Sequence, residues 1–182
     1  MAVPLSQTPR RSSRRPVPPL DAAALERLAL RYVERFATSR GKLSRYLARK
    51  VAERGWNGPP LDPATVAERM AALGYVDDRG FAESKGAALS RRGYGARRVA
   101  ETLRAAGLAE EDAAPVLADA RDVALESALA LARRKRIGPY AAERADPRER
   151  ERHMGVLMRA GHDVSIARRV VNCAPGDIPE PE

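Results

Sequence analysis

The sequence predicts an all-α protein, built as an elongated array of three tandem three-helix repeats that resemble helix-turn-helix units. Only 4% of the 182 residues are aromatic and Ala is abundant. This composition favours close helix packing over a β-sandwich, which prefers β-branched and aromatic residues. Apolar residues recur at steps of three and four, as on the buried face of an amphipathic helix. The pattern also returns at long range, which indicates a repeated unit.

Residues 1–20 are predicted to form a disordered basic arm. They contain five prolines and no acid, so we expect neither a helix nor a core there. The basic residues of the arm are Arg10, Arg11, Arg14 and Arg15. Two interpretations stay open: the arm contacts phosphates without sequence preference, or it is a solvated tail with no dedicated role.

The first repeat is predicted over residues 21–74. The apolar face of its first helix consists of Leu25, Leu28, Ala29, Tyr32, Val33 and Phe36. The apolar face of its second helix, which ends near Gly55, consists of Leu43, Tyr46, Leu47 and Val51. Asp62 caps a third helix, and Pro63 occupies the first position, where a missing amide costs nothing. The buried side of this third helix consists of Val66, Met70 and Leu73.

The middle repeat, residues 75–120, contains the most informative stretch. Asp77 and Asp78 are expected to cap a helix, because a carboxylate accepts bonds from the first free amides and opposes the helix dipole. The run Gly93-Tyr94-Gly95 then predicts a sharp turn. The next helix ends at Gly107, and its apolar face consists of Val99, Leu103 and Ala106. Three acids open the following helix, whose inward residues are Ala113, Val116 and Leu117.

The third repeat is predicted over residues 121–173. A long helix runs from about residue 121 to 136 and ends in four consecutive basic residues. Asp146 and Pro147 begin the next helix with Glu149 at capping-box spacing, and Gly161 ends it. A last helix over residues 163–171 buries Ile166, Val170 and Val171. The acidic, Pro-rich residues 174–182 are expected to be a disordered tail.

Spacing supports the repeat assignment. Val99-x3-Leu103-x3-Gly107 has a counterpart in His153-x3-Leu157-x3-Gly161. Each unit is too short to bury a core alone, so stability must come partly from stacking along an elongated array. Three-helix units with a tight turn also resemble helix-turn-helix modules, which leaves nucleic-acid contact and mere helix packing as alternatives.

The charge of the chain points to an anionic partner. Lys and Arg number 33 against 24 Asp and Glu, for a formal net charge of +9, which suits a polyanion or an acidic protein surface. Basic residues cluster on helix faces opposite the apolar ones and at the Gly-Tyr-Gly turn. The predicted partner-binding residues are Lys42, Arg45, Arg49, Arg91, Arg92, Tyr94, Arg97, Arg98 and Arg104. The alternatives are a solvated helical face for the cations and, for Tyr94, a ring covering its own core.

Catalysis finds little support in the sequence. The acids stand at helix starts, where capping explains them, and no nucleophile has an evident base beside it. We therefore expect no enzyme activity, no cofactor and no metal site, and we interpret His153 as a packed or half-buried residue. The lone Cys173 cannot form an internal disulfide, which fits a reducing cytoplasm. No apolar run of membrane length occurs, and nothing suggests more than a monomer.

The middle repeat resembles the RecX family of bacterial recombination regulators. The resemblance is carried by Leu73-Gly74-Tyr75-Val76-Asp77-Asp78, Phe81-Ala82, Arg92-Gly93-Tyr94-Gly95 and Leu103-x3-Gly107, and it covers residues 25–171. This chain departs from the family pattern at Gly80, where Arg is expected, at Gly41 and Lys42, where an acid is more usual, and at the Pro59-Pro60 insertion. A reversed charge at Lys42 bears on which surface contacts the partner.

The resemblance implies a regulator of homologous recombination, DNA repair and the SOS response. Such a protein binds the RecA filament on single-stranded DNA, inhibits its recombinase, ATPase and co-protease activities, and has weak DNA affinity of its own. The alternative is a stand-alone helix-turn-helix DNA-binding protein, which would bind naked duplex with a steep salt dependence and sequence preference.

Overall fold

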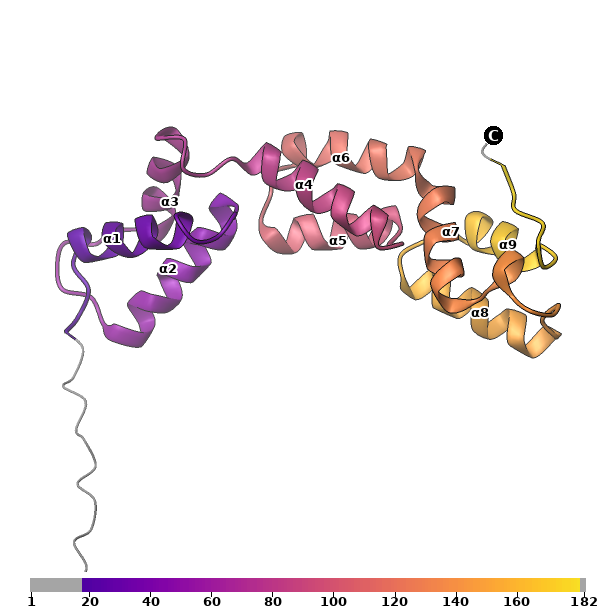
Figure 1. Ribbon diagram of the computed structural model, residues 1–182. Coiled ribbons are helices and arrows are strands. Elements are labelled where there is room, and N and C mark those ends of the chain that lie inside the picture. The colour runs from indigo at the N-terminus through magenta and orange to yellow at the C-terminus, as the bar shows by residue number, and fades with distance from the viewer. Residues whose placement is uncertain (1–17, 181–182) are drawn as a thin grey trace, which may run out of the picture.

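The computed structural model describes residues 18–180, and every regular element in this range is a helix (Figure 1). The predicted all-α class is confirmed. The basic arginines of the arm lie outside the described residues. None of the described helices is both long and apolar enough to cross a membrane. The α-helices are α1 (Ala22–Val33), α2 (Arg40–Arg54), α3 (Pro63–Ala72), α4 (Asp78–Arg91), α5 (Ala96–Ala106), α6 (Glu110–Asp122), α7 (Ala124–Lys135), α8 (Pro147–Arg159) and α9 (Val164–Asn172), and η1 (Gly138–Tyr140) is a 3₁₀ turn.

Three hydrophobic cores lie one after another along the elongated molecule (Figure 1). The first is formed by α1, α2 and α3 around Leu25, Leu43 and Leu47, which are fully buried. The second lies among α4, α5 and α6, and the third among α7, α8 and α9. We call these three-helix groups units one, two and three. Each unit has its own small core, and the units then pack end to end.

Side-chain caps begin six of the described helices, and those at Asp62, Asp77 and Asp146 are predicted from the sequence. The capping residues are Asp21, Ser39, Asp62, Asp77, Asp146 and Asp163. At α8 the capping box is complete, because Asp146 accepts from the Glu149 amide and Glu149 accepts from the Asp146 amide. The Asp-Asp pair behaves differently from the prediction. Asp77 alone caps α4, whereas Asp78 is buried and bonds to unit one.

Glycine turns end the second helices of the units as predicted. Gly107 follows α5 at φ +73°, and Gly161 follows α8 at φ +94°, a left-handed conformation that favours glycine. Unit one departs from this spacing because α2 has 15 residues and α5 has 11, so Gly55 arrives about one helical turn later.

Several predicted burials are wrong at element ends. Phe36 and Leu73 are 54% and 61% exposed, because α1 ends at Val33 and Leu73 only caps α3. Leu20, assigned to the arm, is instead fully buried in the first core. Its amide donates to the Gly55 carbonyl, which ties this part of the chain to the end of α2.

Two further boundaries differ from the prediction in the last third of the chain. Residues 121 and 122 are the last residues of α6. The predicted long helix begins only at Ala124, because the helical conformation is interrupted at Val123. The tail beyond Cys173 has no helix over its described part, yet it is attached. The Gly176 amide donates to the Pro139 carbonyl, and Arg169 bonds to the Glu180 carbonyl.

The second helices of the three units, α2, α5 and α8, form a row along the lower edge of the molecule (Figure 1). The end of α5 meets the start of α2, where the Ser39 hydroxyl donates to the Ala106 carbonyl at 2.7 Å. The end of α8 likewise meets the start of α5, where the Gly95 amide donates to the Ala160 carbonyl at 3.0 Å. Helices in head-to-tail order place a negative helix end against a positive one, which is favourable.

Candidate partner-binding surface

The basic face predicted on α2 is present. Leu43 and Leu47 are buried, and the three cations on the other side of the helix line one hollow of about 320 Å³. The residues that line this hollow are Tyr32, Lys42, Arg45, Tyr46, Arg49 and Ala105. We call it the basic hollow. It spans the junction of two units, because Ala105 comes from α5.

Aromatic rings lie beside the cations of the basic hollow. Tyr32 stacks on Tyr46 with ring centroids 4.3 Å apart, and the Arg49 guanidinium lies 5.7 Å from the Tyr46 centroid. The Lys42 ammonium lies 5.2 Å from the Phe81 ring of unit two. Cations with neighbouring rings are the combination that binds phosphates while stacking on flat groups. The same cations also suit acidic protein side chains.

Arg45 and Arg97 hold equivalent places at the two junctions of the helix row. Arg45 donates to the Ala105 carbonyl at 2.6 Å, and Arg97 donates to the Met158 carbonyl. Each therefore donates to a carbonyl in the last turn of the next unit's second helix, and the Met158 carbonyl also accepts from the Gly161 amide. Both side chains are thus structural contacts as well as predicted binding residues.

The remaining arginines of α5 are exposed, on the side away from the buried Val99 and Leu103. Arg98 forms a pair with Glu101 at 3.2 Å within the helix. Arg104 has no ion pair among residues 18–180. It is therefore the α5 cation most available to a partner.

The turn residues do not join the basic hollow. Arg91 and Arg92 are exposed at the end of α4, and Arg91 lines a different hollow, between α4, α6 and α7. Tyr94 is half-buried and packs against the cores of both unit two and unit three. Its ring therefore covers the edges of these cores, the second of the two interpretations. The predicted binding residues therefore do not form one continuous surface: Arg91 lines this other hollow, and the α2 cations line the basic hollow.

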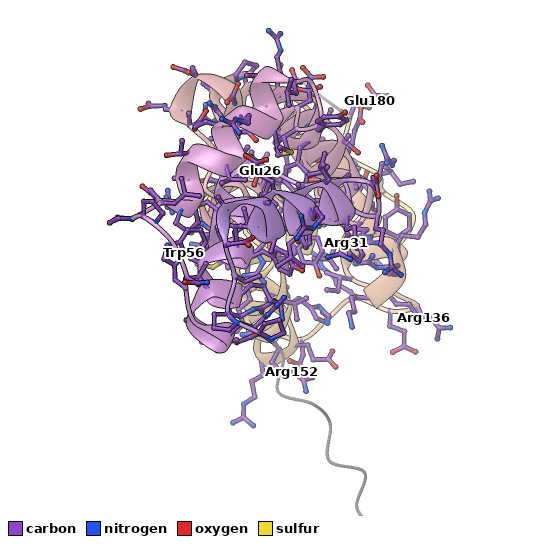
Figure 2. All side chains as sticks on the ribbon, turned by 90° about the vertical axis from the view of Figure 1, so that its left-hand side faces the viewer. Glu26, Arg31, Trp56, Arg136, Arg152 and Glu180 are labelled. Carbon is purple, nitrogen blue, oxygen red and sulfur yellow. The ribbon has the colours of Figure 1, made fainter. Side chains whose placement is uncertain are left out.

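The third unit carries exposed cations that the predicted set leaves out. The basic run at the end of α7 includes Arg136, which adopts a left-handed conformation at φ +55°. Figure 2 views the molecule from its unit-one end and shows Arg136 and Arg152 extending away from the ribbon. Arg133 lies over the Tyr140 ring at 5.1 Å. Cations at a helix C-terminus also favour the helix dipole, so this run has a structural reason to exist.

Sequence reasoning missed the polar cluster at the junction of units one and two. Asp78 of α4 accepts from the Arg40 amide and from the Arg40 Nε, both at 2.8 Å. Arg40 also pairs with Glu68 at 3.2 Å and with Asp112 at 3.6 Å. The hydrogen bonds with Asp78 and then Glu68 raise the Arg40 pKa, so its charge is fixed. Asp78 thus caps α2, a helix of another unit.

His162 occupies the junction of units two and three and was also missed. Its side chain is buried, its Nε2 lies 3.0 Å from the Gly93 carbonyl, and its Nδ1 has no partner. Burial lowers the pKa of His162, although the Gly93 contact opposes this shift. The neutral ring therefore donates from Nε2 to Gly93. His153 is half-buried, as its place in the repeat indicates.

One signal in the sequence marks these junctions. Gly41 and Gly95 are 54 residues apart, and so are Gly107 and Gly161. A Cβ on Gly41 would lie 2.8 Å from Gly107, and one on Gly95 would lie 2.3 Å from the Gly161 oxygen. Matching glycines at the repeat spacing therefore indicate where backbones meet. No such spacing marks Arg40 or Asp78.

The candidate surface offers cations to an anionic partner. Within residues 18–180, no group of three or more His, Cys, Asp or Glu side chains is placed to hold a metal ion. The buried carboxylate of Asp78 accepts hydrogen bonds from the Arg40 side chain and from the Arg40 amide at the start of α2. The lone Cys173 is half-buried, and burial raises the pKa of its thiol, so the nucleophilic thiolate is disfavoured.

Comparison with known proteins identifies relatives over most of the chain, although no family model matches it. The chain is 34% identical over 162 residues to regulatory protein RecX of Myxococcus xanthus, covering 83% of this chain and 86% of that protein. Regulatory protein RecX of Mycobacterium sp. strain KMS is 32% identical over 80% of this chain and 81% of that protein. Regulatory protein RecX of Halorhodospira halophila is 34% identical, over 79% of this chain and 86% of that protein.

A solved structure has the same fold. The crystal structure of a regulatory protein RecX matches this chain with a TM-score of 0.59 at 17% identity. The match covers 81% of this chain and 73% of the other. At this identity the likeness concerns the fold.

Proposed function

Since the chain belongs to the RecX family of regulatory proteins, we propose that it regulates homologous recombination and DNA repair by binding RecA filaments on DNA. Binding inhibits the recombinase, ATPase and co-protease activities of the filament. The contact surface consists of the basic hollow on α2 and the exposed cations of α5. The protein acts in the bacterial cytoplasm as a monomer and carries out no reaction itself.

The observation that supports this proposal is the basic hollow at the junction of two units. A filament presents phosphates and acidic side chains repeatedly along its length, and an elongated row of units can follow such a surface. Arg104 is exposed without an ion pair among the described residues. Arg49 pairs with Glu53 at 3.5 Å within α2 but is 64% exposed, so both cations can reach an anionic partner. The neighbouring tyrosines add surface for contact without further charge.

The helix-turn-helix alternative is disfavoured by the way the units pack. A recognition helix reads DNA through residues near its N-terminus, which must enter the major groove. At the start of α5, the amides of Gly95 and Arg97 donate to the end of α8. At the start of α2, Ser39 and Gly41 lie against Ala106 and Gly107. Both helix starts are occupied by the protein itself.

The proposal is tested with the variant Arg49→Ala/Arg104→Ala and with filaments of RecA on single-stranded DNA. We expect roughly tenfold more protein to be needed for half-inhibition of filament ATP hydrolysis, since each exposed charge contact contributes up to about 1 kcal/mol. Co-sedimentation with the filaments should weaken in parallel. Helical content, measured by circular dichroism, should not change.

The matched control is Arg134→Ala/Arg168→Ala, which removes the same charge from exposed positions of unit three. It should inhibit like the wild type. An equal loss of inhibition in both variants would mean that net charge alone drives binding to the filament. If the wild type neither co-sediments with filaments nor slows their ATP hydrolysis at about micromolar concentration, the proposed function is wrong.

A further inference from the structure

A second hollow lies on a different side of the molecule and contains no residue of α2, α5 or α8. It has a volume of about 590 Å³ and is formed by α4, α6 and α7, so it bridges units two and three. Apart from its charged residues, the hollow is lined by small or apolar side chains, which we call its floor. They include Gly86, Ala87, Ala120, Val123, Ser127 and Ala130. Small side chains let another helix approach closely.

The rim of this hollow is acidic. Glu83, Asp119 and Glu126 surround the floor, and Arg91 is the one cation that lines it. Asp119 and Glu126 are exposed and form no ion pair within the described part of the chain, while Glu83 pairs with Arg79 at 3.1 Å. This acidic groove stands out on a chain with a net charge of +9. It repels a phosphate backbone and attracts Lys and Arg side chains.

We propose that the acidic groove binds a basic amphipathic helix of the protein partner. The apolar face of such a helix would rest on the small-residue floor, and its Lys or Arg side chains would reach Asp119 and Glu126. This inference rests on the proposed function, because it assigns the helix to the recombinase subunits of the filament. The protein thus has two unlike surfaces. The basic hollow binds anionic groups, and the acidic groove binds a cationic segment of the partner protein.

Other occupants fit the acidic groove less well. A strand of nucleic acid is disfavoured by the rim carboxylates. Closer packing of α4 and α6 cannot fill the groove, because these two helices are already in contact below it. A Cβ on Gly86 would lie 2.2 Å from Val116. The exposed Ala87 on the floor has no covering side chain that would need to move first. A helix can therefore bind without a change within unit two.

Two variants of the full-length protein test the groove, each with a matched control. Asp119→Asn/Glu126→Gln removes the free rim charges, and Ala87→Trp fills the floor. The controls are Glu143→Gln/Glu151→Gln, which removes two exposed acids of unit three, and Ala118→Trp, which adds a ring at an exposed α6 position that does not line the groove. Each groove variant should require roughly fivefold to tenfold more protein to inhibit filament ATP hydrolysis. The controls should match the wild type.

A photo-crosslinking amino acid at Glu83, an exposed rim position that leaves the floor open, identifies the occupant in RecA–single-stranded DNA filaments. We expect an adduct with a recombinase peptide rich in Lys or Arg, and we expect it to weaken with Asp119→Asn/Glu126→Gln. An adduct with the DNA, or unchanged inhibition by both groove variants, overturns the groove assignment. Co-sedimentation and the loss caused by Arg49→Ala/Arg104→Ala would then still support the proposed function. A wild type that does not co-sediment overturns both.

Discussion

At the scale of single residues, the junction side chains show how a charge gains a role from its neighbours. Asp78 follows the N-cap of α4 in sequence, yet it caps α2 through the Arg40 amide. The first amides of a helix lack partners and carry a partial positive charge, so a carboxylate from any part of the chain can satisfy them. Asp78 and Arg40 therefore connect two units, and removing Arg40 leaves the buried Asp78 carboxylate without its counter-ion.

His162 makes the second junction sensitive to pH. Burial lowers its pKa below the unfolded value of 6.5, so the unfolded chain binds a proton more readily than the folded protein. The stability contributed by the neutral ring is present above pH 6.5 and is lost as the pH falls through the lower folded value. We expect the fall in thermal midpoint between about pH 7.5 and about pH 5.5 to be smaller for His162→Gln than for the wild type.

The glutamine keeps an amide that can donate to Gly93 and removes only the titration. His153→Gln is the control, because the chain has two histidines and this one lies away from the Gly93 contact. Comparing each protein with itself at two pH values cancels any constant cost of the substitution. An equal fall in thermal midpoint in His162→Gln and in the wild type would contradict this role for His162.

At the scale of the elements, the ends of helices determine how the units join. α2 and α5 both begin against the end of another helix, and glycine stands at each contact. Gly95 has an ordinary φ of −79°, so its requirement comes from space and not from backbone conformation. Glu149 lies 54 residues after Gly95, where α8 begins with its own capping box. That helix start is satisfied by its own side chains.

We expect Gly95→Ala to destabilise the protein by about 1–3 kcal/mol, because its Cβ forces the start of α5 away from the end of α8. Urea unfolding monitored by circular dichroism measures the effect. Gly155→Ala is the matched control, since the atom nearest its Cβ is the flexible end of Arg159 at 3.0 Å. Within α8 that change should be neutral or stabilise by up to about 1 kcal/mol. Similar losses for both would mean that the junction tolerates a Cβ.

At the scale of the whole molecule, the two junctions differ in kind. Units two and three share Tyr94, which packs against both cores. Units one and two share no residue between their hydrophobic clusters, and their contact is largely polar, through Arg40, Asp78, Ser39 and Arg45. Ion pairs at partly exposed positions weaken with salt, whereas apolar contacts do not. The first junction is therefore the more adaptable one.

Distance measurements between labels on units one and two test this difference. With Cys173→Ser as background, labels at Ala52→Cys and Ala118→Cys should report a broader distance distribution at about 1 M salt than at about 0.05 M. Arg40→Gln should give the broad distribution at both concentrations. Lys50→Gln breaks an ion pair within α2 and should leave the distances unchanged. A narrow distance distribution in Arg40→Gln at low salt would contradict this role of the polar contact between units one and two.

The sequence by itself determined the all-α class, the caps, the glycine stops and the family resemblance. These features are local, because helix periodicity, capping and left-handed glycines depend on residues within one or two turns. The basic face of α2 followed from the same periodicity. Errors occurred where a helix ends, at Phe36 and Leu73, since periodicity continues in the letters after the helix has stopped.

Only the tertiary structure decided which residues join the units. Arg40 and Asp78 are 38 residues apart, and His162 and Gly93 are 69 apart, so no local pattern relates them. The acidic groove likewise requires three helices from two units to meet. Long-range contacts depend on how helix ends pack, and this packing decides which charged residues join the units and which remain exposed.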